Sequence, residues 1–151
     1  MSAEKNLSQL NINLPKAPDP VGSYVASKIV GNLIYISGQV SFNSKGELTK
    51  GKIGKELSLE QGQDAAKLCA LNILAQLKKK CGSLDKVKGC IKLTGYVNST
   101  ESFIDQPKVL NGASDLISKI FGDSGKHTRA AISVSSLPLG AAVEVDGIFE
   151  L

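Results

Sequence analysis

Apolar and polar residues follow two different periods along the chain, and each period predicts one kind of secondary structure. Apolar positions at helical spacing predict one helix that opens at Ser58 and ends at Gly82, and a second from about Pro107 to Gly122. Short apolar or alternating runs predict strands. These runs cover residues 24–30, 33–37, 91–97, 129–135 and 142–149.

Local signals mark the ends of several of these elements. The Gly31–Asn32 pair between two apolar runs predicts a hairpin turn. Ser58 followed by Gln61 has the spacing of a capping box, and Gly82 is suited to stop the same helix. Pro107 is a favoured first-turn residue of the second helix. The stretch 43–55 is rich in Gly and Lys and predicts a loop with at most one short edge strand.

The order of elements is β-β-α-β-α-β-β, which predicts a single α+β domain over residues 14–151. We expect a mixed sheet with two helices on one face, so that the other face meets either water or another subunit. Residues 1–13 are polar and precede a proline-rich stretch, which predicts a loosely ordered N-terminal extension.

Alternation assigns the two sides of the strand at 129–135. His127, Arg129 and Ala131 fall on one side, and the more apolar set that includes Ala130 and Ile132 falls on the other. We expect the apolar set to pack on the helices and the set with Arg129 to face outward. A shift of one residue would reverse this assignment.

Arg129 is the only arginine among 18 basic residues, and the only histidine, His127, lies two positions before it. A guanidinium is a planar fork that binds a carboxylate or phosphate through two parallel hydrogen bonds, which lysine cannot imitate. The pattern therefore indicates an anion-binding arginine. The alternative is a surface ion pair in a lysine-biased sequence.

Composition narrows the classes of function. The net charge of +4 is mild and the aromatic content is 5%, which argues against a nucleic-acid partner. The three cysteines lack metal-type spacing, so we expect no metal. The N-terminus lacks the layout of a signal peptide and no apolar run is long enough for a membrane helix, which predicts a cytoplasmic protein.

From Ala17 to the C-terminus, the chain resembles the Rid family, also called the YjgF or reactive-intermediate deaminase family. An ordered set of motifs carries the resemblance: Val21–Val25, Gly31–Gln39, Arg129, Val134–Pro138 and Val143–Val145. It implies a chorismate-mutase-like fold and a homotrimer with clefts between subunits. It also implies a hydrolase that converts small reactive 2-enamino or 2-imino acids to 2-keto acids and ammonia without a cofactor.

The resemblance also implies roles for particular residues. Arg129 matches the arginine that binds the substrate carboxylate, and Glu144 matches the acidic residue proposed to position or activate water. Tyr24 matches the tyrosine of the Gly-x-Tyr motif, and Gly38 matches the glycine of Ser-Gly-Gln. Asn111 lies where many members have an asparagine near the site. Glu144 could instead pair with a lysine at the subunit seam.

Departures from the family pattern leave alternatives open. Ala131 replaces a Cys or Thr, Ser23 replaces a proline and Ala26 replaces a glutamine. His127 stands in place of a proline, and it is either a substrate-binding acid or base of the pocket or a hydrogen-bonding residue on the helix side or at an interface. The alternatives to a deaminase are a non-catalytic trimeric module that binds small carboxylates and an endoribonuclease.

Overall fold

A five-stranded mixed sheet forms the centre of the computed structural model, which describes residues 2–151. The strands lie in the order β1-β2-β5-β3-β4. All neighbouring pairs are antiparallel except β3 and β4, which are parallel. The strands are β1 (Ser27–Val30), β2 (Leu33–Val40), β3 (Gly89–Asn98), β4 (Thr128–Val134) and β5 (Val143–Glu150).

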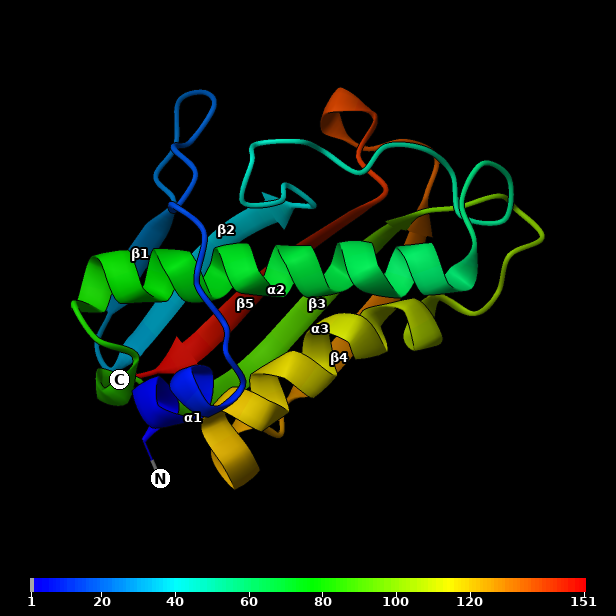
Figure 1. Cartoon of the computed structure of the whole chain (residues 1–151). Helices are drawn as coiled ribbons and strands as arrows, with labels where there is room; N and C mark the ends of the chain where they lie inside the picture. Colours follow the sequence, from blue (N-terminus) through cyan, green and yellow to red (C-terminus); the bar gives the residue numbers. More distant parts are fainter. Residues whose placement is uncertain (1) are drawn as a thin grey trace.

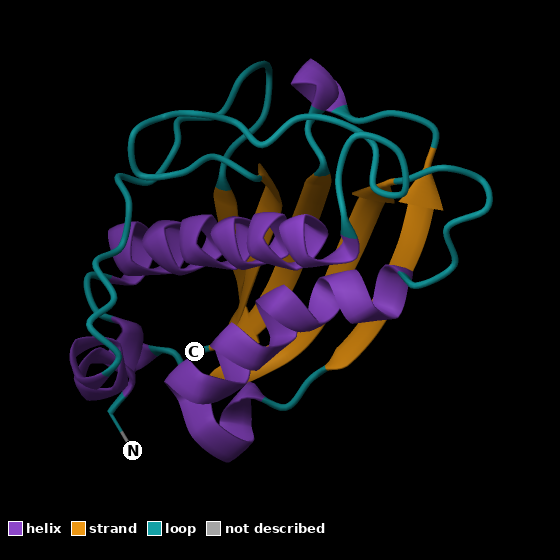
Figure 2. Cartoon of the chain, turned by 45° about the vertical axis from the view of Figure 1, so that its right-hand side comes forward, coloured by secondary structure: helices purple, strands orange, loops and turns teal. Residues whose placement is uncertain are grey.

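Two long helices cover one face of this sheet (Figures 1 and 2). The helix α2 (Leu59–Cys81) packs over β2 and β5, and α3 (Gln106–Phe121) packs over β3 and β4. Short 3-10 turns follow at Leu84–Lys86, Gly122–Gly125 and Pro138–Gly140. The predicted α+β class and the two helices on one face are therefore confirmed. None of the helices within residues 2–151 has the length and apolarity to cross a membrane.

The ends of α2 are those that the capping signals predict. The Ser58 side chain accepts a hydrogen bond from the Gln61 amide, and the Gln61 side chain accepts one from the Ser58 amide. Gly82 ends the helix with φ 82°, a conformation that favours glycine. Because these caps depend on residues close in sequence, they act without tertiary support.

Between the helices and the sheet lies one apolar core. Alternate residues of β5, such as Val143, Val145 and Phe149, face it and are fully buried. The helices meet closely where Gly112 of α3 crosses the backbone of Gln63, because a Cβ at position 112 would collide with that carbonyl. The core thus fixes α3, and with it the residues that α3 presents to β4.

The N-terminal segment differs from the expectation of a loosely ordered extension. Ala3–Gln9 forms the helix α1, and its Ala3 and Leu7 side chains are buried in the core. The Asn6 amide donates to the Ile120 carbonyl at 2.8 Å. The apolar pattern at helical spacing could not predict this helix, because only two of its residues are buried. Met1, the first residue of the predicted extension, lies outside the described residues.

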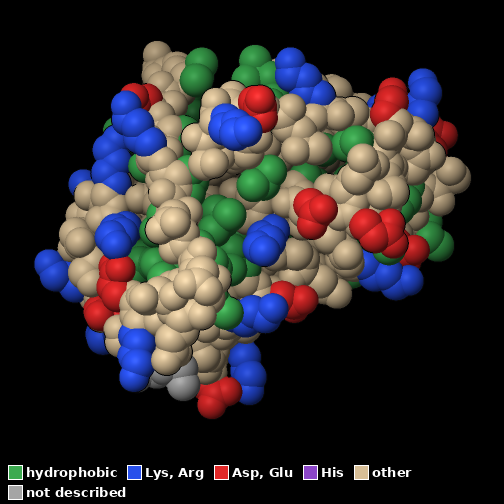
Figure 3. All heavy atoms as spheres, in the orientation of Figure 1, with side chains coloured by type: hydrophobic (Ala, Val, Ile, Leu, Met, Phe, Trp, Pro, Cys, Tyr) green, Lys and Arg blue, Asp and Glu red, His purple; other side chains and the backbone are tan. Residues whose placement is uncertain are grey.

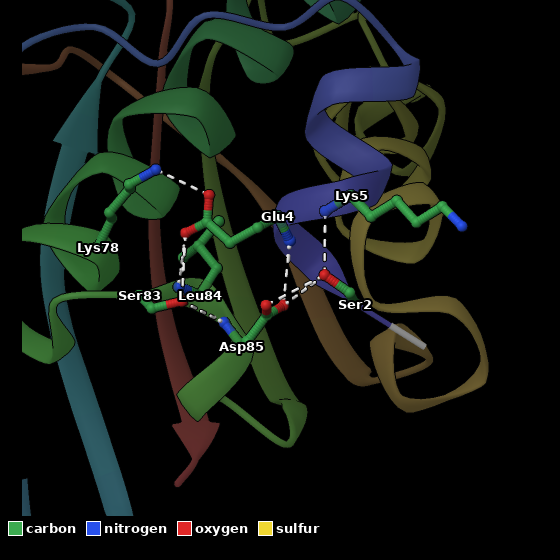
Figure 4. A network of polar contacts seen from close by, with 7 residues as sticks. All are labelled: Ser2, Glu4, Lys5, Lys78, Ser83, Leu84 and Asp85. Atoms are coloured by element: carbon green, nitrogen blue, oxygen red, sulfur yellow. Dashed lines mark hydrogen bonds and ion pairs between the residues drawn. The ribbon is translucent and has the colours of Figure 1, made fainter.

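A network of hydrogen bonds and one ion pair connects α1 with the end of α2 and with the 3-10 turn that follows α2 (Figure 4). The Glu4 carboxylate pairs with Lys78 at 2.7 Å and accepts a hydrogen bond from the Leu84 amide at 3.0 Å. The pKa of Glu4 is therefore below its ordinary value, mainly because of the hydrogen bond with Lys78 and then because of the one from the Leu84 amide. Ser2 caps α1 and also contacts the Asp85 carboxylate at 3.0 Å.

The orientation of β4 is the reverse of the predicted one. Arg129 pairs in register with the buried Leu93 and lies on the helix side of the sheet. Ile132 pairs with Tyr96 on the helix-free side and is 47% exposed. β4 is an edge strand that α3 covers only in part, so a polar residue fits on its helix side. The prediction that the more apolar side of β4 packs on the helices was therefore wrong.

Candidate functional site

A pocket of about 780 Å³ opens on the helix-free side of the sheet. β2 and β5 form its floor, and the segments 18–26 and 138–139 form its walls. Tyr24, Gly38 and Glu144, which the sequence analysis selects as site residues, all line it. Three residues from separate parts of the chain are thus brought into one hollow.

The Glu144 carboxyl group lies directly against Gly38. A Cβ at position 38 would collide with the Glu144 side chain, so this glycine leaves the space that the carboxyl group occupies. Within residues 2–151 the Glu144 carboxyl group accepts no hydrogen bond and forms no ion pair. Burial raises its pKa above the ordinary value, and the negative charge of Asp146 adds to the effect. An unpaired carboxyl group in a hollow is available to a ligand or to water.

Asp146 is a second acidic residue of the pocket, and the sequence analysis did not select it. It lies two residues after Glu144 on β5 and therefore on the same side of the sheet. Its carboxylate accepts a hydrogen bond from the Tyr96 hydroxyl at 2.9 Å. Burial and this hydrogen bond raise the pKa of Tyr96. The alternation Glu144-Val-Asp146 is the signal that could have identified Asp146.

Tyr24 stands at the mouth of the pocket. The residue is 49% exposed, and its hydroxyl accepts a hydrogen bond from the Val21 amide at 3.3 Å. The hydroxyl thus helps to hold the loop before β1 in shape. At this position the Tyr24 ring can form an aromatic wall of the pocket.

Arg129 lies in a different cluster, between β4 and α3. Its Nη1 atom donates to the Asn111 side chain at 2.9 Å and to the Ser114 hydroxyl at 3.1 Å, and its Nη2 atom donates to the Pro107 carbonyl at 3.2 Å. Of the five N–H groups of a guanidinium, two are left without a partner within residues 2–151. The side chain is half-buried and α3 fixes its direction.

His127 belongs to the same cluster as a hydrogen-bonding residue. Its Nδ1 atom lies 2.6 Å from the Gly125 carbonyl, and its Nε2 atom lies 2.9 Å from the Ser114 hydroxyl. Because a carbonyl can only accept, Nδ1 carries the proton and Nε2 of the neutral ring accepts from Ser114. Ser114 therefore donates to His127 and accepts from Arg129. Sequence reasoning missed Ser114, although it follows Asn111 by three residues on one helical face.

The selected residues thus form two groups within one chain. Tyr24, Gly38 and Glu144 lie in the pocket on the helix-free side, whereas Arg129, Asn111 and His127 lie on the helix side near the edge of the sheet. Neither group alone combines an arginine with a carboxyl group over a hollow. Throughout residues 2–151, no three His, Cys, Asp or Glu side chains are grouped to hold a metal ion.

The fold and the pocket define a class of protein. Two helices on one face of a mixed sheet, with a pocket on the other, are the features of chorismate-mutase-like α+β domains. The chain belongs to the YjgF family: the family described as "YjgF/chorismate mutase-like, putative endoribonuclease" matches residues 4–151. The resemblance found in the sequence is thereby confirmed.

Individual relatives carry different names. The chain is 45% identical over 147 residues to protein TCP17 of Trypanosoma cruzi, covering 97% of this chain and 92% of that protein. It is 28% identical over 138 residues to the human 2-iminobutanoate/2-iminopropanoate deaminase, covering 91% and 86%. A solved structure from Shewanella oneidensis MR-1, described as "a putative endoribonuclease", superposes with a TM-score of 0.96 at 35% identity and full coverage of both chains.

Proposed function

We propose that the protein hydrolyses reactive 2-imino and 2-enamino acids to 2-keto acids and ammonia. The observation that carries this proposal is the Glu144 carboxyl group, which lies unpaired against Gly38 in the pocket with a raised pKa. The human relative named as an imine deaminase supports the reaction class.

The reaction needs few groups. A proton at C3 converts the enamine to the iminium form, and water then adds to C2 as Glu144 accepts its proton. Glu144 returns this proton to the nitrogen, the C–N bond breaks, and ammonia leaves as the C=O bond forms and the hydroxyl proton passes to the Glu144 carboxylate or to water. A carboxyl group whose pKa is shifted toward neutrality can both accept and return a proton.

Arg129 supplies the second part of the proposed site. Its two free N–H groups are suited to a substrate carboxylate, and its bonds to Asn111, Ser114 and Pro107 hold the guanidinium before the substrate arrives. Since Arg129 and Glu144 lie on opposite sides of one sheet, we propose a homotrimer. In it, Arg129 of one subunit completes the pocket of its neighbour.

The test compares wild-type protein with the Arg129→Lys variant. 2-Aminoacrylate and 2-iminobutanoate are generated in situ, and the rate of keto-acid appearance is measured. We expect acceleration by wild type and a loss of about 100-fold or more in kcat/KM in the variant, because lysine keeps the charge but removes the fork. A Lys45→Arg variant, at an exposed position outside the pocket, is the control. Full activity in Arg129→Lys would contradict the proposed role of the arginine.

Two further measurements separate the alternatives. A non-catalytic carboxylate-binding module would show thermal stabilisation by 2-keto acids without faster imine hydrolysis. An endoribonuclease would bind RNA with an affinity that falls as salt rises. Lysines and acidic residues are interspersed over the helix-bearing face, which does not form a continuous basic surface (Figure 3).

A further inference from the structure

We infer that the pocket receives a large apolar side chain, so that the preferred substrate is an imino or enamino acid with a branched or aromatic side chain. The inference rests on the proposed function for the reaction and adds the specificity of the same site. Three observations support it: the size of the pocket, the character of its walls and the distribution of charge around it.

The pocket is large for a three- or four-carbon acid. Its volume of about 780 Å³ falls in the range of roughly 300–1,000 Å³ that is usual for pockets of drug-sized ligands. Ala26 contributes to this volume, because its short side chain lies in the wall where a longer one would project into the hollow. In a single chain, a ligand of a few heavy atoms would fill only a small part of this space.

The walls of the pocket are largely apolar. Val40, Phe42 and Ile148 line it from the sheet side, and Val21 and Leu139 line it from the loops. Leu139 is 64% exposed and adopts φ 60°, a conformation that costs free energy in a bulky residue. The fold therefore keeps an apolar side chain at the rim, where an apolar ligand would cover it.

The charged residues that line the pocket determine the orientation of the bound substrate. Among residues 2–151 the pocket is lined by three acidic residues and by no lysine or arginine. Asp19 pairs with Lys79 at 3.3 Å, so Glu144 and Asp146 supply the unpaired negative charge. A substrate carboxylate is repelled from such a lining, whereas a protonated nitrogen is attracted. The nitrogen and the side chain therefore enter, while the carboxylate stays at the mouth, where an arginine from another subunit can reach it.

The test compares substrates and one wall variant. An amino-acid oxidase generates imines from alanine, leucine and phenylalanine, and kcat/KM for their hydrolysis is measured. We expect values at least about tenfold higher for the leucine and phenylalanine products than for the alanine product, the scale of discrimination that one or a few apolar groups give. Wild-type preference for the alanine product would overturn the inference and leave the proposed reaction standing.

The Ala26→Gln variant fills part of the pocket. We expect it to lower kcat/KM for the bulky imines about tenfold more than kcat/KM for the alanine-derived imine. Ser44→Gln, in an exposed turn outside the pocket, is the matched control and should change neither. An equal loss for all imines in Ala26→Gln would contradict a role in side-chain selection.

A binding measurement separates failure of this inference from failure of the proposed function. If no imine is hydrolysed faster, the proposed reaction is wrong. Thermal stabilisation by phenylpyruvate and by pyruvate then tests the pocket by itself. A larger shift with phenylpyruvate that is lost in Ala26→Gln supports a large apolar ligand, and an equal or larger shift with pyruvate refutes it.

Discussion

The buried carboxyl group of Glu144 makes the stability of the protein depend on pH. Burial, and then the charge of Asp146, raise its pKa, so the folded protein binds a proton more tightly than the unfolded chain does. The free energy of unfolding therefore falls as pH rises from the ordinary value of 4.5 through the higher folded value. At neutral pH the ionised group costs stability, a cost that the proposed role of Glu144 would explain.

This cost predicts that Glu144→Gln is more stable than wild type at pH 7. The expected rise in melting temperature is on the order of 1–3 °C for a chain of this size. The difference should shrink as pH falls toward 4, where the wild-type carboxyl group is protonated. Glu101→Gln, at an exposed turn, is the control and should leave the melting temperature unchanged. A lower melting temperature in Glu144→Gln would mean that the carboxylate makes stabilising contacts.

At the scale of elements, α1 gives a direct test of the N-terminal structure. Leu7 is 5% exposed and Leu10, just beyond the helix, is 43% exposed. Leu7→Ala should lower the free energy of unfolding by about 2–3 kcal/mol through lost burial and a cavity. Leu10→Ala should cost less than about 1 kcal/mol. Denaturant unfolding measures both, and equally small losses would show that α1 does not add to the core.

What the sequence can predict about an element depends on how local its causes are. The limits of α2 follow from the Ser58–Gln61 capping box and from Gly82, all of which act within one helical turn. The orientation of β4 depends on how far α3 covers an edge strand, which no nearby residue determines. The helix α1 is held by partners far along the chain, such as Leu84 and Ile120, and its own residues are mostly polar.

The same distinction applies to the candidate site. The motifs at Tyr24, Gly38 and Glu144 identified residues that share one pocket. Their separation from Arg129 could not be predicted, because it follows from the side of the sheet on which Arg129 lies. The contacts of Asp146 with Tyr96 and of Ser114 with Arg129 join residues distant in sequence. Only the spacing of these two residues from Glu144 and Asn111 could have identified them.

At the scale of the whole molecule, the helix-free face of the sheet carries exposed apolar side chains such as Tyr35 and Ile132. We expect this face to be covered by other copies in a trimer with three times the chain mass of 15.9 kDa. Ile132→Lys should break this contact, because a charge would be buried without a partner. Ile104→Lys, on a loop where Ile104 is 80% exposed, is the matched control.

Sedimentation equilibrium measures both variants. The assembly would be supported if the wild type and the Ile104→Lys variant are trimers and the Ile132→Lys variant is a monomer. A wild-type monomer would contradict it, as would a trimeric Ile132→Lys variant that melts like wild type.

The position of Arg129 and Glu144 on opposite sides of one sheet has a genetic consequence. If each cleft takes its arginine from one subunit and its carboxyl group from the next, two alleles that are each inactive can complement one another. Co-expressed Arg129→Lys and Glu144→Gln subunits would form mixed trimers in which one cleft contains both native residues. Cells carrying both alleles should then recover part of the activity that neither allele supplies alone.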